Sequence, residues 1–119
     1  MKTARVIESF GALAHGHRLA IYRLLVEQGP EGLHAGAIGE RIGLVPSTLT
    51  FHLQNLQHSG LIACRRVGRQ LIYSADFAAM NGLVGYLTEN CCAASGQSCD
   101  AVCKPAAATR RPKRVVRAA

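Results

Sequence analysis

A chain of 119 residues, 49% of them hydrophobic, is long enough to bury one modest core and is expected to form a single domain. It contains no apolar run long enough to span a membrane, and its opening residues, MKTARVIESFG, lack the hydrophobic stretch of a signal peptide. From these features we expect a cytoplasmic protein with reduced thiols, and neither a membrane nor a secreted protein. The odd number of cysteines, five, also argues against a complete disulfide set.

The net charge of +7 belongs mostly to one end of the chain. Residues 1–103 contain eight basic and seven acidic residues, a net of +1, whereas residues 104–119 contain six basic residues and no acidic one. The latter segment also has two prolines and many small residues, so we predict a disordered basic tail there. Such a tail favours contact with polyanions, but it does not show that the folded part binds DNA.

The first half of the sequence predicts four helices. Apolar residues recur at helical spacing over residues 5–15 and 17–29, and a short third helix is expected over 34–43. A fourth begins at Pro46 or Ser47 and ends before Gly60.

The pattern then changes to that of a β-hairpin. LIACRRV and QLIYSAD are short, apolar and partly β-branched, and Gly68-Arg69 between them suits a two-residue turn. A last helix is expected over 76–90, with Asp76 as its N-cap and one apolar stripe formed by Phe77, Met80, Val84 and Leu87. This order predicts a mainly α protein with a β-hairpin wing, that is, a winged helix-turn-helix.

The fourth helix has the composition of a DNA-reading helix. Leu49, Leu53 and Leu56 form an apolar stripe that should pack on the other helices, and His52 on its flank should be a buried structural histidine. The opposite side carries no acidic residue, and in this motif it lies in the major groove, where amide side chains bond adenine and an aromatic ring can touch a thymine methyl. A solvated amphipathic helix would show the same pattern, and this helix alone favours that interpretation. The predicted DNA contacts from this helix are Ser47, Thr48, Thr50, Phe51, Gln54 and Asn55.

Three arginines near the hairpin turn, Arg65, Arg66 and Arg69, strengthen the DNA hypothesis. Arginines at a wing tip can bind phosphates or enter the minor groove. Charges also commonly protect exposed strand edges, which is the alternative explanation. The helix order and the basic wing together favour DNA binding.

The stretch IGLVPSTLTFHLQNLQHSGLIACRRVGRQLIYSAD resembles the helix-turn-helix and wing of the ArsR/SmtB family of metal-responsive repressors. The resemblance covers roughly residues 5–90. It implies a homodimer through the first and last helices that binds a palindromic operator and releases it when metal binds. The chain departs from some members, since His34 and Gly36 stand where arsenic sensors can carry cysteines in the third helix, and no histidine follows Asp76 in the last helix. The matching features are Thr48, Thr50, His52-Leu53, Leu56, Gly60-Leu61-Ile62, Arg66, Gly68, Arg69 and Tyr73.

Four cysteines, Cys91, Cys92, Cys99 and Cys103, are the predicted metal ligands. Soft thiolates select soft ions, and As(III) or Sb(III) takes three thiolates in a pyramid. Cys91, Cys92 and Cys99 fit this need, and Cys103 or a cysteine of the other subunit could supply the third ligand. Some arsenic- and antimony-sensing members of the family carry a similar adjacent pair after the last helix, so the resemblance implies an As(III) or Sb(III) effector and no organic cofactor.

Other uses of these cysteines stay open. Four thiolates could form a zinc site or a Zn/Cd sensor, and a disulfide between the two halves of the cluster could form a redox switch. A metalloid carrier would explain the cysteines but not the DNA-reading elements. Cys64, in mid-strand, should be a small buried residue.

The sequence does not predict an enzyme. No cysteine is followed by arginine at the spacing of a thiol-based phosphate-binding loop, and no Gly-rich nucleotide loop or nucleophile elbow is present. We therefore predict a metalloid-responsive repressor divided into a DNA-binding and dimerisation domain (1–90), a cysteine-rich metalloid-binding segment (91–103) and a basic tail (104–119).

Overall fold

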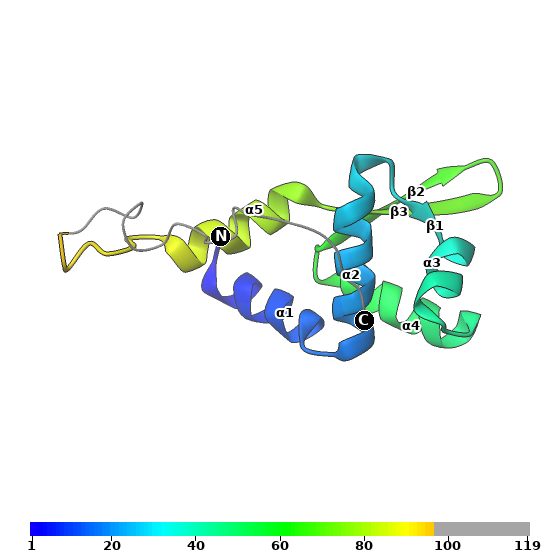
Figure 1. Ribbon diagram of the computed structural model, residues 1–119, viewed down its shortest axis with the longest axis horizontal. Helices are drawn as coiled ribbons and strands as arrows, with labels where there is room; N and C mark the ends of the chain where they lie inside the picture. The colour runs from blue at the N-terminus through cyan, green and yellow to red at the C-terminus, as the bar shows by residue number, and fades with distance from the viewer. Residues whose placement is uncertain (97–119) are drawn as a thin grey trace. The chain divides into compact units, whose positions relative to one another are not determined.

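The structure, a computed structural model, describes residues 1–96, of which Met1–Leu87 form one compact unit and Thr88 begins a second (Figure 1). Two of the predicted ligands, Cys99 and Cys103, and the predicted tail over 104–119 lie outside the described residues. The elements in chain order are α1 (Thr3–Leu13), α2 (Gly16–Gln28), the 3-10 turn η1 (Gly29–Glu31), β1 (Leu33–His34), α3 (Ala35–Ile42), α4 (Pro46–His58), β2 (Ile62–Val67), β3 (Gln70–Ala75) and α5 (Phe77–Thr88).

The predicted order of helices, hairpin and helix is confirmed, and so is the winged helix-turn-helix. Helices α3 and α4 are joined by a tight turn in which Gly43 is left-handed, with φ 84°. The His34 side chain caps α3, because its Nδ1 accepts a hydrogen bond from the Ala37 backbone N–H at 3.3 Å. Pro46 occupies the first turn of α4, where its missing N–H costs nothing.

The wing is the predicted hairpin, with one strand that the sequence did not reveal. Strands β2 and β3 pair antiparallel from Ile62↔Ala75 to Val67↔Gln70, which leaves Gly68-Arg69 as the turn, and Gly68 has the positive φ that this turn needs. Strand β1 adds to the other edge of β3, giving the order β1-β3-β2. Two residues are too few to show an alternating pattern, so β1 could not be read from the sequence.

One hydrophobic core joins the helices to the base of the sheet. The three leucines predicted to form the apolar stripe of α4 are buried, and so are Ile21 and Leu25 of α2. The complete set of buried hydrophobic residues is Val6, Ile21, Tyr22, Leu25, Ile38, Leu49, Leu53, Leu56, Leu61, Ile62, Tyr73, Ala75 and Leu83.

Helices α1 and α5 meet where α1 begins and α5 ends (Figure 1), and both expose large apolar side chains. The Thr3 hydroxyl and the Tyr86 hydroxyl are 2.7 Å apart, which links the first and last helices. Asp76 caps α5 as predicted, since its Oδ1 accepts from the Ala79 backbone N–H at 3.1 Å. The predicted stripe of α5 is divided: its first two members, Phe77 and Met80, pack on the core, while Val84 and Leu87 are exposed.

The buried residue of α5 is instead Leu83. Cys64 was predicted to be buried but is half-buried at the edge of the core. Among the described residues, no helix has the length and apolar character needed to cross a membrane.

Candidate nucleic-acid interface and ligand sites

The polar side of α4 is free of the core along its first two turns. Ser47, Thr48, Thr50 and Phe51 are exposed, and Gln54 is exposed one turn later. Phe51 is 59% exposed, so a large apolar side chain lies among these polar ones. The exposed side of α4 therefore carries hydrogen-bonding groups and one aromatic ring, and their contact with a groove stays a prediction.

Asn55 differs from the other predicted contacts on α4. Asn55 is half-buried, whereas the others are exposed, and its Nδ2 donates a hydrogen bond to the Phe51 carbonyl at 2.9 Å. This bond within the helix occupies one of the two amide N–H donors. Gln54 is thus better placed than Asn55 to make a bidentate bond with a base.

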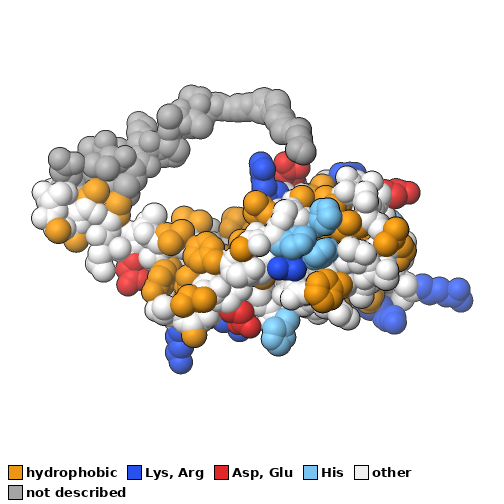
Figure 2. Space-filling view, turned by 90° about the horizontal axis from the view of Figure 1, so that it is seen from below, with side chains coloured by type: hydrophobic (Ala, Val, Ile, Leu, Met, Phe, Trp, Pro, Cys, Tyr) orange, Lys and Arg blue, Asp and Glu red, His pale blue; other side chains and the backbone are white. Residues whose placement is uncertain are grey.

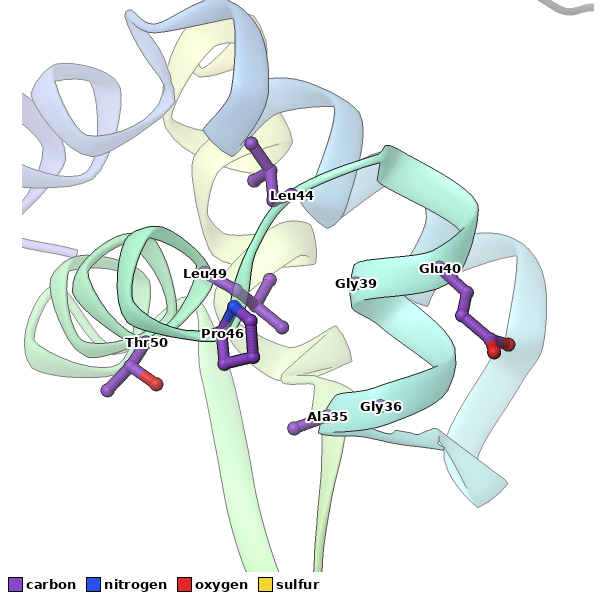
Figure 3. A pocket seen from close by; sticks show the side chains of 8 residues that line it. All are labelled: Ala35, Gly36, Gly39, Glu40, Leu44, Pro46, Leu49 and Thr50. Carbon is purple, nitrogen blue, oxygen red and sulfur yellow. The ribbon is translucent and has the colours of Figure 1, made fainter.

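An open hollow lies where α3 meets α4 (Figure 3). Its volume is about 470 Å³ and its walls are mainly apolar. Figure 3 shows Thr50 of α4 and Glu40 of α3 on opposite sides of the opening. The sequence did not predict this hollow, because two separate helices form it. The lining residues are Ala35, Gly36, Gly39, Glu40, Leu44, Pro46, Leu49 and Thr50.

The three predicted wing arginines are all exposed, but they do not form one cluster. Arg66 pairs with Leu71 and Arg65 with Ile72, so these neighbours in β2 point to opposite faces of the hairpin, while Arg69 lies in the turn. Arg65 is held towards the body of the unit, since its Nη2 donates to the Glu31 carbonyl at 3.0 Å. Arg69 is therefore the arginine at the tip, and Arg65 contributes least to it.

Three histidines meet beside α4. His15 precedes α2, His17 lies in the first turn of α2, and His52 projects from α4. Each histidine offers one ring nitrogen, and these three nitrogens lie within 4.8 Å of one another. Figure 2 shows histidine side chains gathered on one face next to a basic side chain. His52 is buried, as predicted, whereas no sequence pattern indicated that His15 and His17 would join it.

A guanidinium completes this histidine group. Arg18 Nε donates to the Ala12 carbonyl at 2.7 Å, and its Nη1 lies 3.4 Å from Nδ1 of His52. Burial lowers the pKa of His52 below its ordinary value of 6.5, and the charges of His15, Arg18 and His17 lower it further. The His52 ring is therefore neutral near pH 7.

The thiols of the adjacent cysteine pair lie close together. Cys91 Sγ and Cys92 Sγ are 3.7 Å apart, in a turn where Asn90 and Cys92 both have φ of 61°. Both cysteines are half-buried. Cys64 is far from them in sequence; it pairs with Tyr73 across the hairpin, and burial and the Cys64 thiol raise the pKa of Tyr73.

Comparisons with known proteins agree with this geometry. A family described as a helix-turn-helix domain matches residues 13–65. The chain is 40% identical over 60 residues, 50% of this chain and 59% of the relative, to an uncharacterized HTH-type transcriptional regulator, YceK, from Bacillus subtilis. The chain spans about 60% of the length of the curated relatives that it matches.

Solved structures extend the similarity over about three quarters of the chain. The homodimeric winged helix-turn-helix DNA-binding domain of Mb0332 from Mycobacterium bovis, described as a possible ArsR-family transcriptional regulator, has a TM-score of 0.58 and 32% identity, covering 74% of this chain and 82% of that one. The transcriptional repressor BigR from Xylella fastidiosa has a TM-score of 0.57 and 30% identity, covering 73% and 86%.

Proposed function

The chain belongs to the ArsR type of winged helix-turn-helix proteins, and we propose that it is a repressor that binds operator DNA as a homodimer and releases it when As(III) or Sb(III) binds its cysteine thiolates. The observation that carries the metalloid part is the adjacent pair of thiols, 3.7 Å apart, three residues after the last helix of a DNA-reading fold.

The DNA part of the proposal is supported by α4 and the turn of the wing. Helix α4 buries its leucines and exposes hydroxyl side chains in its N-terminal half, which is the half that meets base edges in this motif, and it exposes the amide of Gln54 one turn later. Arg69 at the hairpin turn is placed for a phosphate or the minor groove. A net charge near zero over residues 1–103 means that these local contacts, rather than a general positive charge, would direct binding.

The homodimer is supported by uncovered apolar side chains on α1 and α5. Ile7 is 65% exposed, Phe10 39%, Val84 56% and Leu87 65%, although all four are large hydrophobic residues. Covering such a surface with a second copy removes it from water at about 25 cal/mol per Å². The similar Mb0332 domain is homodimeric, and a symmetric dimer would place two α4 helices about 34 Å apart, one turn of DNA.

The thiol spacing supports binding of both sulfurs to one ion. Two thiolates at a metal–sulfur distance of about 2.3 Å and a tetrahedral angle are about 3.8 Å apart, close to the 3.7 Å between Cys91 Sγ and Cys92 Sγ. Little rearrangement is therefore needed for this pair to chelate. Cys99 or Cys103 would provide the third thiolate that a trivalent metalloid requires.

Effector and DNA would be coupled through the end of α5. Capture of the ion would join thiolates of the cysteine segment that directly follows this helix in the chain. If the DNA-bound arrangement of the dimer binds the ion more weakly, the ion lowers operator affinity by the same coupling free energy, typically about 1–3 kcal/mol.

A Zn(II)- or Cd(II)-responsive repressor, or a thiol redox switch, is the second candidate. The same 3.7 Å sulfur separation also fits two legs of a tetrahedral zinc site. A trivalent ion needs three thiolates and zinc favours four, so zinc would use both Cys99 and Cys103, whereas the metalloid would use only one of them.

The deciding experiment offers As(III), Sb(III), Zn(II) and Cd(II) to the reduced full chain and measures bound ion per protomer. We expect one As(III) or Sb(III), lost in Cys91→Ser and retained in Cys64→Ser. A gel shift with DNA from upstream of the protein's own gene should show binding by apo protein and release by the metalloid. Zinc binding that survives Cys91→Ser, without metalloid binding, would overturn the metalloid assignment, and absence of a shift would favour a carrier.

A further inference from the structure

The histidine group beside α4, formed by His15, His17 and His52, has the chemistry of a metal site that contains no thiol. The ring centroids of His15 and His52 are 4.6 Å apart, and His17 is 5.6 Å from each. The ligand atoms of the three rings lie within 4.8 Å of one another. Three residues from two separate segments thus converge on one point.

Structural roles explain two of these rings but not the third. Nδ1 of His15 accepts from the His17 backbone N–H at 3.1 Å and so caps α2. His52 Nδ1 faces Arg18. The His17 ring approaches both other rings without serving as a cap, and this approach is what a shared ligand would require.

The geometry is close to that of a three-histidine site. Nitrogen ligands about 2.0–2.1 Å from a tetrahedral ion are about 3.4 Å apart, so the nitrogens must close by at most about 1.4 Å. His15 and His17 are exposed and can rotate at little cost, whereas His52 is buried and fixes the position of the site. Imidazole nitrogens suit Zn(II), Ni(II), Cu(II) and Co(II), and three protein ligands leave one position for water.

The positive charge of Arg18 would repel a bound cation, and Arg18 contacts one of the three histidines, His52. A guanidinium only donates, so Nδ1 of His52 is the acceptor in the 3.4 Å contact. An ion at Nδ1 would displace Nη1 of Arg18, and an ion at the other ring nitrogen would move the ring proton to Nδ1. In both cases ion binding exchanges the Arg18–His52 contact for a bond between the start of α2 and α4.

We propose that His15, His17 and His52 bind one divalent transition-metal ion of the zinc type, in a site separate from the cysteines. The ion would fasten the α1–α2 junction to α4. This inference does not depend on the proposed function, because it uses no thiolate and no DNA contact.

The test uses the full chain with Cys91, Cys92, Cys99 and Cys103 replaced by serine, so that these four thiolates cannot compete, and the unit over residues 1–87, which includes Cys64, is left unchanged. Titration with zinc chloride, followed by calorimetry, should show one ion per protomer. His17→Asn in this background should weaken binding by at least roughly tenfold. His58→Asn is the matched control, since His58 also lies on α4 but is 84% exposed and outside the group.

A second variant and a ring spectrum distinguish loss of the metal ligand from misfolding. His15→Asn keeps a residue that caps helices well, so its circular dichroism should be unchanged while its zinc affinity falls. In the ring ¹H–¹⁵N spectrum, paramagnetic Co(II) should broaden the signals of His15, His17 and His52 before those of His34 and His58. Equal zinc affinity of His17→Asn and His58→Asn, or no binding by the four-serine chain, would refute the site.

Discussion

The hydroxyls of Thr3 and Tyr86 lie 2.7 Å apart, so the first and last helices of the compact unit are joined across 83 positions of sequence. Beside this link, the same two helices expose Ile7, Val84 and Leu87. Two linked helices that both expose large apolar side chains are suited to pack against a second copy of the chain.

Val84→Glu should weaken the homodimer. The exposed valine would become a charge that must be buried or left unpaired at the interface, and we expect the dimer dissociation constant to rise by at least roughly tenfold, about 1.4 kcal/mol. Sedimentation velocity over a range of protein concentrations measures this. Leu71→Glu, on the exposed part of the hairpin, is the control and should leave the dimer intact. Equal dissociation constants for the two variants would place the dimer surface elsewhere.

Gln54→Ala and Arg69→Ala should change DNA binding in different ways. Loss of a base contact by Gln54 should cost about 1–3 kcal/mol on operator DNA and little on scrambled DNA, whereas loss of a phosphate contact by Arg69 should weaken both and reduce the salt slope by about 1. Fluorescence anisotropy at several salt concentrations separates the two.

Two controls belong to that comparison. Gln57→Ala removes an exposed amide near the end of α4 and should have no effect. Arg65→Ala should change the salt slope less than Arg69→Ala, because Arg65 is already bonded to the Glu31 carbonyl. Equal effects of the two arginines would contradict the assignment of Arg69 as the tip contact.

Gly32→Ala should destabilise the fold strongly. Gly32 has φ 73° and ψ −167°, a conformation open almost only to glycine, and an added Cβ would overlap the Tyr73 carbonyl group of β3. We expect the melting temperature to fall by at least about 5 °C. Gly16→Ala, where a Cβ meets nothing within 4 Å, should leave it unchanged or raise it slightly. A melting temperature of Gly32→Ala that matches Gly16→Ala would show that the η1–β1 turn can relax.

The fold should lose stability as the pH falls below about 6.5. Burial, followed by the charges of His15, Arg18 and His17, lowers the pKa of His52 in the folded chain. In that pH range the unfolded chain binds a proton that the folded chain does not, so the free energy of unfolding decreases as the pH falls, and the loss is complete below the folded pKa. Urea unfolding in EDTA at about pH 7.5 and pH 5.5 should give a lower midpoint at the acid pH.

Variants identify the titrating group. His52→Asn should show a smaller decrease of the midpoint between the two pH values, even though its stability at neutral pH is lower. His58→Asn removes a histidine that is 84% exposed and should retain the full decrease. A pH dependence that is unchanged in His52→Asn would assign the effect to another group.

Much of the architecture followed from local patterns. The α4 stripe of Leu49, Leu53 and Leu56 was predicted because apolar residues at helical spacing mark the face of a helix that is buried. The hairpin turn at Gly68-Arg69 and the Asp76 cap were predicted because each depends on the conformational preference of one or two residues. The adjacent pair Cys91-Cys92 was visible as a ligand candidate for the same reason, since neighbours in sequence are neighbours in space.

Packing between segments decided the rest. Periodicity placed Phe77, Met80, Val84 and Leu87 on one stripe, but only the position of α1 and the core determines that the first two are covered and the last two exposed. Strand β1 forms because it pairs with the edge of β3. The pleat of β2 places Arg65 and Arg66 on opposite faces of the hairpin. His15 and His52 are 37 positions apart and share no pattern, so no local rule could bring them together with His17; burial of α4 against α2 did so.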